Sequence, residues 1–160
     1  MNLERDLATA QAAARANNVW DGHFFHLFPT LWPVMGRVVS RFGGRPDPFD
    51  DSQEFHPGLD IRANLNTPIF AAADGRVVTV EENAIYGRTI VLEHTENLTS
   101  KYAHLSQIRV KQGQQVTQGQ LIGLSGDTGK VTGPHLHFEL RKNGTIIDPT
   151  QFLTRAYHFK

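Results

Sequence analysis

Four histidines and one aspartate occur in short motifs whose residue types suit the binding of a metal ion. His56 and Asp60 are four residues apart in "FHPGLDI", His104 lies in "KYAHLS", and His135 and His137 flank a leucine in "TGPHLHFEL". Imidazole nitrogens and carboxylate oxygens bind zinc at roughly 2.0–2.2 Å, and a catalytic zinc keeps three protein ligands and one position for water. Taken together, these residues predict a zinc site.

The two histidines of "TGPHLHFEL" share one face if this stretch is a strand. Successive side chains of a strand point to opposite faces, so His135, His137 and Glu139 lie on one side and three apolar residues on the other. The apolar side is typical of a core face. The two imidazoles are two residue rises apart, roughly 7 Å at Cα. This spacing fits two ligands of one metal or two neighbouring functions, and does not choose between them.

The motif "FHPGLDI" can bring His56 and Asp60 to one point without a helix. Pro57 and Gly58 between them disfavour a helix, and positions i and i+4 of an extended chain share a side. The other histidines are predicted to be structural: His23, His26, His94 and His158. His94 ends a strand in "VLEHTEN", where a hydrogen-bonding role is expected.

The composition is that of an ordinary globular domain. The chain has 160 residues, enough for one domain with a core, and its formal net charge is +0. A neutral balance argues against a nucleic-acid binder that works by bulk charge. There is no cysteine, which excludes disulfides, cysteine zinc sites and thiol nucleophiles. No apolar run is long enough to span a membrane, and "MNLERDLATA" lacks the apolar stretch of a signal peptide.

The periodicity of the sequence predicts a mainly β domain with an N-terminal α-helical extension. Residues 2–17 are rich in alanine and repeat apolar residues at helical spacing. An aromatic stretch, "VWDGHFFHLFPTLWPV", follows and is expected to pack onto the main domain. From about Met35 onward, short runs rich in Val, Ile, Thr and aromatics are separated by Gly, Pro, Asn and Asp, apart from a long polar loop, "GRPDPFDDSQEF". We expect a single antiparallel β-sheet.

The order and spacing of these pieces resemble the LytM, or lysostaphin-type, zinc metallopeptidases of the M23 family. The matching stretches are "FHPGLDI", "TPIFAAADGRVV", "YGRTIVLEH", "YAHLS", "VKQGQQVTQGQLIGLSGDTG" and "TGPHLHFEL". The resemblance covers roughly residues 32–153 and implies an antiparallel sheet or half-barrel. It divides the chain into an N-terminal helix and connecting segment (1–31), a LytM-like zinc peptidase domain (32–153) and a C-terminal tail (154–160).

The resemblance also implies a role for each residue of the motifs. His56 and Asp60, and His137 as the second histidine of "HLH", resemble the three ligands of one zinc ion per chain. His104 and His135 resemble the catalytic histidines beside the metal. The implied reaction is the attack of a zinc-bound water on an amide, with the histidines handling protons. Glu139 has no catalytic role in the family pattern.

Family members cleave peptide cross-links of bacterial peptidoglycan, so the implied partners are peptidoglycan peptides, in the periplasm or outside the cell. Neither nucleic acid nor a membrane span is expected. The resemblance allows for a regulatory envelope protein without identifying it. The loop "GGRPDPFDDSQEF", which leads into His56, is the expected wall of a peptide groove. The N-terminal segment could cover the site, but packing or tethering is the preferred interpretation.

Three other interpretations can be weighed on the residues. An inactive LytM-type regulator would lack zinc ligands, whereas all five site residues are present here. A biotinyl or lipoyl carrier needs a modifiable lysine at a hairpin tip, which the sequence does not offer. The stretch "GDTGKVTG" is similar to a phosphate-binding loop, but Leu124 replaces its first glycine and Val131 its final Ser or Thr. Its glycines are predicted to form turns that bring His135 into the site.

Overall fold

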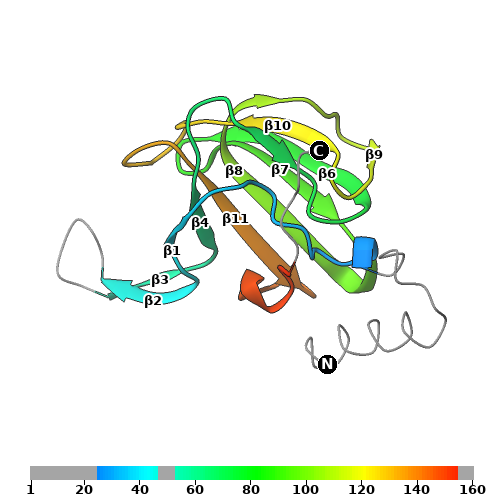
Figure 1. Ribbon diagram of the computed structural model, residues 1–160, viewed down its shortest axis with the longest axis horizontal. Helices are drawn as coiled ribbons and strands as arrows, with labels where there is room; N and C mark the ends of the chain where they lie inside the picture. Colours follow the sequence, from blue (N-terminus) through cyan, green and yellow to red (C-terminus); the bar gives the residue numbers. More distant parts are fainter. Residues whose placement is uncertain (1–24, 47–52, 155–160) are drawn as a thin grey trace.

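A computed structural model describes residues 25–46 and 53–154 of the chain (Figure 1). The helix predicted over residues 2–17, the histidines at 23 and 158, and the tail from residue 155 lie outside this part. The domain boundaries predicted at residues 31/32 and 153/154 stay predictions. Within the described residues, the helices are three short 3-10 turns, Phe25–Leu27, Thr95–Asn97 and Pro149–Gln151. None of these has the length or the apolar composition that crossing a bilayer requires.

The described residues form one large open antiparallel sheet, which confirms the predicted β fold. Its path runs β1-β4-β11-β8-β7-β6-β9, with β12 on β11 and with β10 joined to both β5 and β8. The strands are β1 (Val38–Ser40), β4 (Leu59–Arg62), β5 (Pro68–Phe70), β6 (Gly75–Asn83), β7 (Gly87–Glu93), β8 (Leu98–Ile108), β9 (Gln115–Val116), β10 (Leu121–Ser125), β11 (His135–Lys142) and β12 (Thr145–Ile147). The long central strands β8 and β11 pair over six residues from His137↔Ala103 to Lys142↔Leu98.

A separate two-stranded hairpin replaces much of the loop expected before His56. Strands β2 (Gly43–Pro46) and β3 (Gln53–His56) pair antiparallel, with Gly43 opposite His56. The expectation of a loop was wrong for these residues. The segment lacks alternating apolar side chains, but backbone hydrogen bonds can pair two strands without them. The hairpin projects away from the main sheet (Figure 1), and its second strand ends on His56.

The core lies on the face of β11 that carries the apolar residues. Leu136, Phe138 and Leu140 are all fully buried, as the alternation of the sequence predicts. Phe138 packs against the ring of Tyr102 on β8, with ring centroids 5.2 Å apart. The described end of the aromatic stretch also joins this core, since Phe28 is buried and stacks on Phe152 at 6.2 Å. The opposite face of β11 is left for polar residues.

A buried hydrogen-bond chain runs beside the core at the start of β8. His94 places Nδ1 2.7 Å from the backbone oxygen of Asp74 and Nε2 2.7 Å from the hydroxyl of Ser100. The Ser100 hydroxyl lies 2.8 Å from the hydroxyl of Tyr102, which accepts the backbone N–H of Ala72 at 2.9 Å. The predicted hydrogen-bonding role of His94 is therefore confirmed. Burial raises the pKa of Tyr102 to about 12, so its hydroxyl stays neutral.

The buried imidazole of His94 should make the domain less stable in acid. Burial lowers its pKa to about 4, from 6.5 for an exposed imidazole. Between these pH values the unfolded chain binds a proton that the folded chain excludes, so the free energy of unfolding falls as the pH drops through this window. The expected loss is at most roughly 3 kcal/mol.

Urea unfolding of the metal-free protein between about pH 7 and pH 4 measures this loss. The matched variant His94→Gln cannot titrate, and should show a shallower fall over the same range. Parallel curves for the two proteins would contradict the assignment.

Candidate metal and catalytic site

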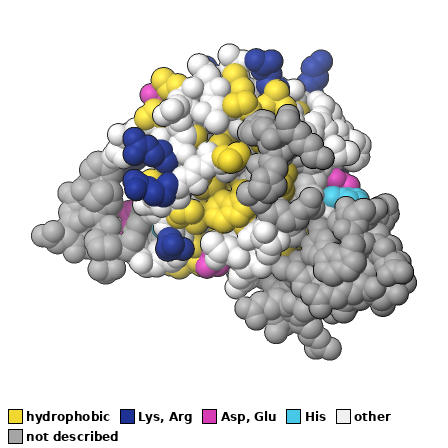
Figure 2. Space-filling view, in the orientation of Figure 1, with side chains coloured by type: hydrophobic (Ala, Val, Ile, Leu, Met, Phe, Trp, Pro, Cys, Tyr) yellow, Lys and Arg dark blue, Asp and Glu magenta, His cyan; other side chains and the backbone are white. Residues whose placement is uncertain are grey.

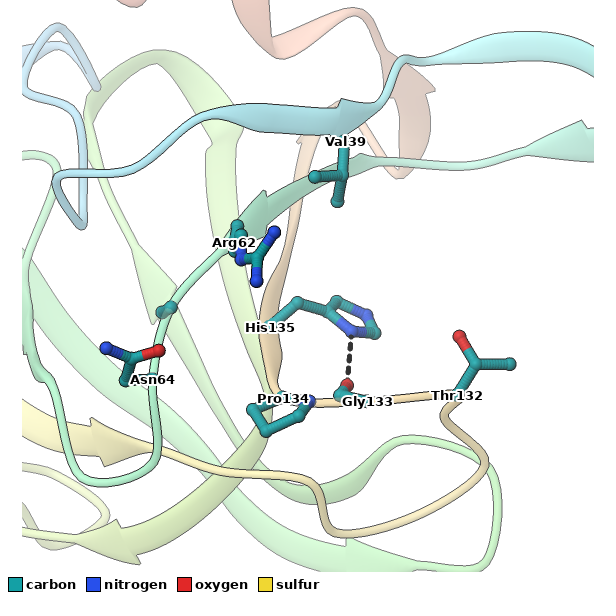
Figure 3. Close-up of a pocket in the computed structure, with 8 residues that line it drawn as sticks. Val39, Arg62, Asn64, Thr132, Gly133, Pro134 and His135 are labelled. Carbon is teal, nitrogen blue, oxygen red and sulfur yellow. Dashed lines mark hydrogen bonds between the residues drawn. The ribbon is translucent and has the colours of Figure 1, made fainter.

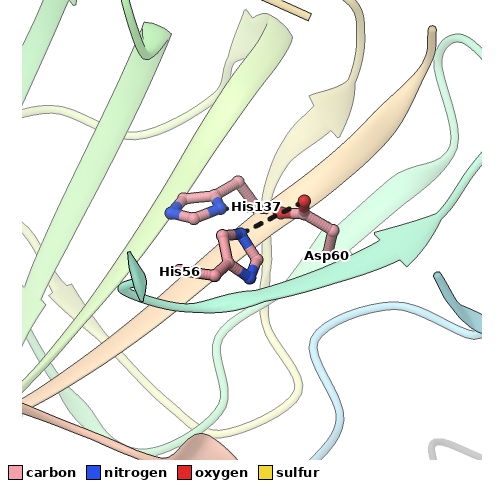
Figure 4. A group of neighbouring side chains, drawn as sticks. All are labelled: His56, Asp60 and His137. Carbon is pink, nitrogen blue, oxygen red and sulfur yellow. Dashed lines mark hydrogen bonds and ion pairs between the residues drawn. The ribbon is translucent and has the colours of Figure 1, made fainter. Parts of the chain in front are cut away.

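Three strands bring His56, Asp60 and His137 together on the polar face of the sheet (Figure 4). His56 ends β3, Asp60 lies in β4, and His137 lies directly opposite Asp60 in β11. All three are buried, and each offers one ligand atom within 4.8 Å of the others. The predicted trio is thus a compact group that could hold a metal ion.

A glycine lets the β3–β4 turn pass close enough to β11 to form this group. A Cβ at Gly58 would lie 2.5 Å from the backbone oxygen of Phe138 and 2.9 Å from Cε1 of His137. Contacts of this kind are too short for any larger residue without a shift of the backbone. The Pro57-Gly58 pair between His56 and Asp60 therefore brings the turn directly against the ring of His137.

His56 and His137 each have a hydrogen-bond partner on the ring nitrogen that points away from Asp60, so the other ring nitrogen faces Asp60. His56 Nδ1 lies 2.9 Å from the backbone oxygen of Arg41, and His137 Nε2 lies 2.9 Å from Oε1 of Glu139. An N–H on each of these outer nitrogens leaves a lone pair on the inner one. The inner nitrogens lie 3.2 Å (His56 Nε2) and 2.7 Å (His137 Nδ1) from the carboxylate of Asp60. In these tautomers the three acceptors form a donor set that fits a divalent metal, whereas a proton on an inner nitrogen makes the hydrogen bond to Asp60.

The charges within the group are strongly coupled. Burial alone would raise the pKa of Asp60, but its hydrogen bonds to His137 and His56 hold that pKa well below its usual range. Burial would likewise lower the pKa of His137, yet the carboxylates of Asp60 and Glu139 raise it. The site thus favours positive charge at its centre, which is the property that a cation site requires.

Glu139 is a fully buried carboxylate behind the group, and its contact with His137 was missed from the sequence. It accepts the hydroxyl of Tyr86 at 3.0 Å and Nη2 of Arg141 at 3.3 Å, and Lys101 lies opposite it in β8. Burial would raise its pKa, but the bond to His137, the charge of Lys101 and the hydroxyl of Tyr86 lower it. The only available signal was its place on the same strand face as the histidines.

His104 reaches the site through a distortion of β8. Its backbone is left-handed, with φ of 62°, and its N–H bonds to the oxygen of Tyr86 at 2.7 Å. The pairing of β7 with β8 shifts register in this region. The distortion turns the His104 ring towards His137 and His135, at centroid distances of 6.0 Å and 5.0 Å. Such a bulge re-aims a side chain that regular alternation would place with Tyr102 in the core.

Backbone oxygens contact the same ring nitrogen, Nδ1, in both His104 and His135. Nδ1 of His104 lies 2.7 Å from the oxygen of Thr128, and Nδ1 of His135 lies 3.0 Å from the oxygen of Gly133. An N–H on each Nδ1 leaves Nε2 as the free acceptor. For His135 this nitrogen lies 3.6 Å from Oδ1 of Asp60. Burial and the neighbouring histidines lower the pKa of His104 to about 4, so its ring is neutral at physiological pH.

The glycine-rich "GDTG" loop supports His104 as well as His135. Gly87 and Gly129 both have positive φ, and a Cβ at Gly129 would lie 2.4 Å from the nitrogen of Gly87. A Cβ at Gly87 would in turn lie 2.3 Å from Oγ1 of Thr128. The loop thereby presents the Thr128 oxygen to His104, while Gly126 forms a bridge with His135. These contacts give the glycines a packing role in place of phosphate binding.

The structure brings all five residues singled out from the sequence into one polar site. His56, Asp60 and His137 form the metal-binding group, and His104 and His135 flank it. Their division into ligands and catalytic residues stays a prediction. Tyr86, Thr128 and Glu139 are the supporting residues that sequence reasoning did not find.

Comparison with known proteins places this site within a family. The profile described as Peptidase family M23 matches residues 54–149, which contain all five site residues. The peptidoglycan DD-endopeptidase ShyA of Vibrio cholerae is 46% identical over 93 residues, which make up 58% of this chain and 22% of that protein. The chain spans about a quarter of the length of the curated relatives that it matches.

Solved structures agree with the sequence comparison. A zinc-containing peptidase from Vibrio cholerae superposes with a TM-score of 0.68 at 33% identity, covering 79% of this chain and 39% of that one. The catalytic domain of lysostaphin from Staphylococcus simulans gives a TM-score of 0.67 at 33% identity, covering 75% of this chain and 93% of that one. The sheet, the site and the matched profile agree that this chain belongs to peptidase family M23.

Proposed function

We propose that this chain is a zinc metalloendopeptidase that hydrolyses peptide bonds of bacterial peptidoglycan. The observation that carries the proposal is the convergence of three buried ligand atoms beside two imidazoles whose Nδ1 atoms are held by backbone oxygens. The names of relatives such as the DD-endopeptidase ShyA support the substrate class. A peptidoglycan substrate likewise supports a periplasmic or extracellular place of action.

In this proposal, His56 Nε2, one oxygen of Asp60 and His137 Nδ1 hold the zinc ion. A zinc ion bound there would lower the pKa of a water ligand to about 7 and polarise the amide carbonyl. Arg41 and Glu139 keep the two imidazoles in the orientation that this binding needs. The alternative of an inactive LytM-type binding module is disfavoured, since none of the five site residues is missing.

His104 and His135 would move protons at their Nε2 atoms. In the tautomer that donates Nδ1–H to a backbone oxygen, Nε2 carries the lone pair, so it can take a proton and later release it to the leaving amine. Their rings lie 5.0 Å apart and border the metal group, which lets both reach a peptide bound there. The low pKa of His104 keeps its ring unprotonated at neutral pH.

Digestion of purified sacculi tests the function directly. Incubation with the zinc-loaded protein should release soluble fragments, and mass spectrometry of these products should identify newly freed peptide ends and the bond that was cut. A matched incubation with a chelator should release none. Intact sacculi after exposure to protein with a full complement of zinc would refute the proposed function.

Removing the charge of Glu139 should weaken the hold on the metal. In Glu139→Gln the buried group keeps its shape but no longer offers a carboxylate to His137 Nε2 at 2.9 Å. Zinc affinity should fall by about 10–100-fold, which is typical for the loss of an outer-shell partner. Competition with a chromophoric chelator measures the affinity. Glu93→Gln, at an exposed ion pair with Arg76, is the control and should leave it unchanged; equal affinities in the two variants would refute the role.

A further inference from the structure

A pocket of about 340 Å³ opens beside His135 (Figure 3). It is bordered by Val39, Arg62, Asn64, Thr132 and Pro134, together with His135. A second hollow of about 380 Å³ adjoins it through Arg62, Ala63 and Asn64, and adds Arg37. The two hollows form one surface, hereafter the arginine pocket. It contains two arginines, and none of the described residues that line it is acidic.

The sheet places Arg62 on the same face as the metal-binding group. Along β4, Leu59 and Ile61 are fully buried, so Asp60 and Arg62 point to the opposite face. Arg62 lies directly opposite His135 in the pairing of β4 with β11, just as Asp60 lies opposite His137. A peptide in contact with His135 and the metal group would therefore come within reach of Arg62.

The backbone of the preceding segment brings Arg37 to the same place. The N–H of Arg62 bonds to the oxygen of Arg37 at 2.8 Å. A Cβ at Gly36 would lie 2.0 Å from the oxygen of Arg62, so only glycine allows this close approach. Figure 2 shows Lys and Arg side chains on the side of the molecule where Figure 1 places β1 and β4. The two positive charges are thus held together by the fold.

Within the described part of the chain, neither arginine of the pocket forms an ion pair with a carboxylate. Arg76, Arg88 and Arg141 each form an ion pair with a glutamate. Over residues 25–46 and 53–154, no ion pair involves Arg37 or Arg62, and both side chains are exposed. A guanidinium is a planar fork of N–H donors that matches a carboxylate. An anionic group of a ligand would supply the missing partner.

We propose that Arg62, with Arg37 beside it, binds a carboxylate of the peptide substrate and so selects peptides that carry one near the scissile bond. This inference rests on the proposed function, because it takes the bound peptide to lie against His135. The carboxylate would come from the peptide's own C-terminus or from an acidic side chain of the peptide. Arg62 is a specificity residue in this scheme and takes no part in the proton transfers.

Hydrolysis of matched peptides tests the proposal. A cross-linked peptidoglycan peptide is compared with two derivatives, one amidated at its C-terminus and one amidated at its side-chain carboxylate. The wild-type protein should cleave one derivative with about tenfold lower kcat/KM, mainly through KM, which corresponds to one exposed charge-assisted contact. The affected derivative identifies the carboxylate. Arg62→Gln should remove this preference by losing activity on the free acid alone.

The control Arg76→Gln changes an exposed arginine on β6, four strands from β4 in the sheet, and should keep the wild-type preference. Equal kcat/KM on all peptides for the wild type, or an unchanged preference in Arg62→Gln, would overturn the inference while the peptidase function stands. If no peptide is cleaved, the proposed function fails. Calorimetric titration of the same peptides then decides whether the arginine pocket binds a carboxylate. Binding that weakens about tenfold on amidation in the wild type, but not in Arg62→Gln, supports the arginine pocket, and equal binding refutes it.

Discussion

Alanine at position 137 is expected to abolish zinc binding and all measurable hydrolysis. The imidazole of His137 offers one of the three atoms that could hold a metal ion, and its Nδ1 lies 2.7 Å from Asp60, at the centre of the group. Its removal leaves two protein ligands and two buried carboxylates, Asp60 and Glu139, that lose their shared partner. Zinc affinity should fall by more than about 100-fold, the upper end of what a supporting residue alone contributes. Elemental analysis and chelator competition measure the loss.

His26→Ala is the matched control, because His26 is a partly exposed histidine that pairs with Asp74 away from the site. It should retain one zinc per chain and full activity. Far-UV circular dichroism separates metal loss from misfolding in His137→Ala, since the large core of the sheet does not involve this imidazole. Stoichiometric zinc in folded His137→Ala would refute the ligand assignment.

The metal-binding group could be predicted because it depends on regular strands. Alternation in "TGPHLHFEL" places His137 on the polar face of β11, opposite the buried Leu136 and Phe138. The same alternation in β4 gives Asp60 the polar face. What the sequence could not provide is the register that sets Asp60 opposite His137, since pairing between distant strands depends on the whole sheet.

The surroundings of His104 could not be predicted, because they depend on irregular backbone. In a regular strand His104 would share the buried face of Tyr102, yet a left-handed residue in β8 turns it into the site. The Thr128 oxygen that orients it comes from a loop 24 residues further along the chain. Its contact depends on the close approach of two turns at Gly87, which no local pattern in the sequence reports.

Glu139 illustrates a different limit of sequence reasoning. Its position on the histidine face was visible in the alternation, but the family pattern gave it no catalytic role. In the structure it lies behind His137, where it also accepts hydrogen bonds from Tyr86 and Arg141. A residue that acts only through a ligand carries no signature of its own, so contacts are needed to recognise it.

Replacing His104 should leave the zinc in place and remove most of the turnover. His104 is not among the three ligand residues, and its ring centroid lies 6.0 Å from that of His137. Loss of a positioned acid–base group typically costs about 10²–10⁴-fold in rate, so His104→Ala should lose kcat by this factor with one zinc still bound. Steady-state kinetics on a cross-linked peptide, with zinc content measured on the same sample, test the prediction.

The left-handed backbone at His104 demands a second variant, because alanine tolerates φ of 62° poorly. Asparagine is enriched in this conformation, so His104→Asn should keep the bulge of β8 while removing the imidazole. If the imidazole handles protons, both variants lose turnover equally, whatever their stability. If its role is only to shape the strand, His104→Asn should regain wild-type kcat, and the assignment of His104 as a catalytic residue would then be wrong.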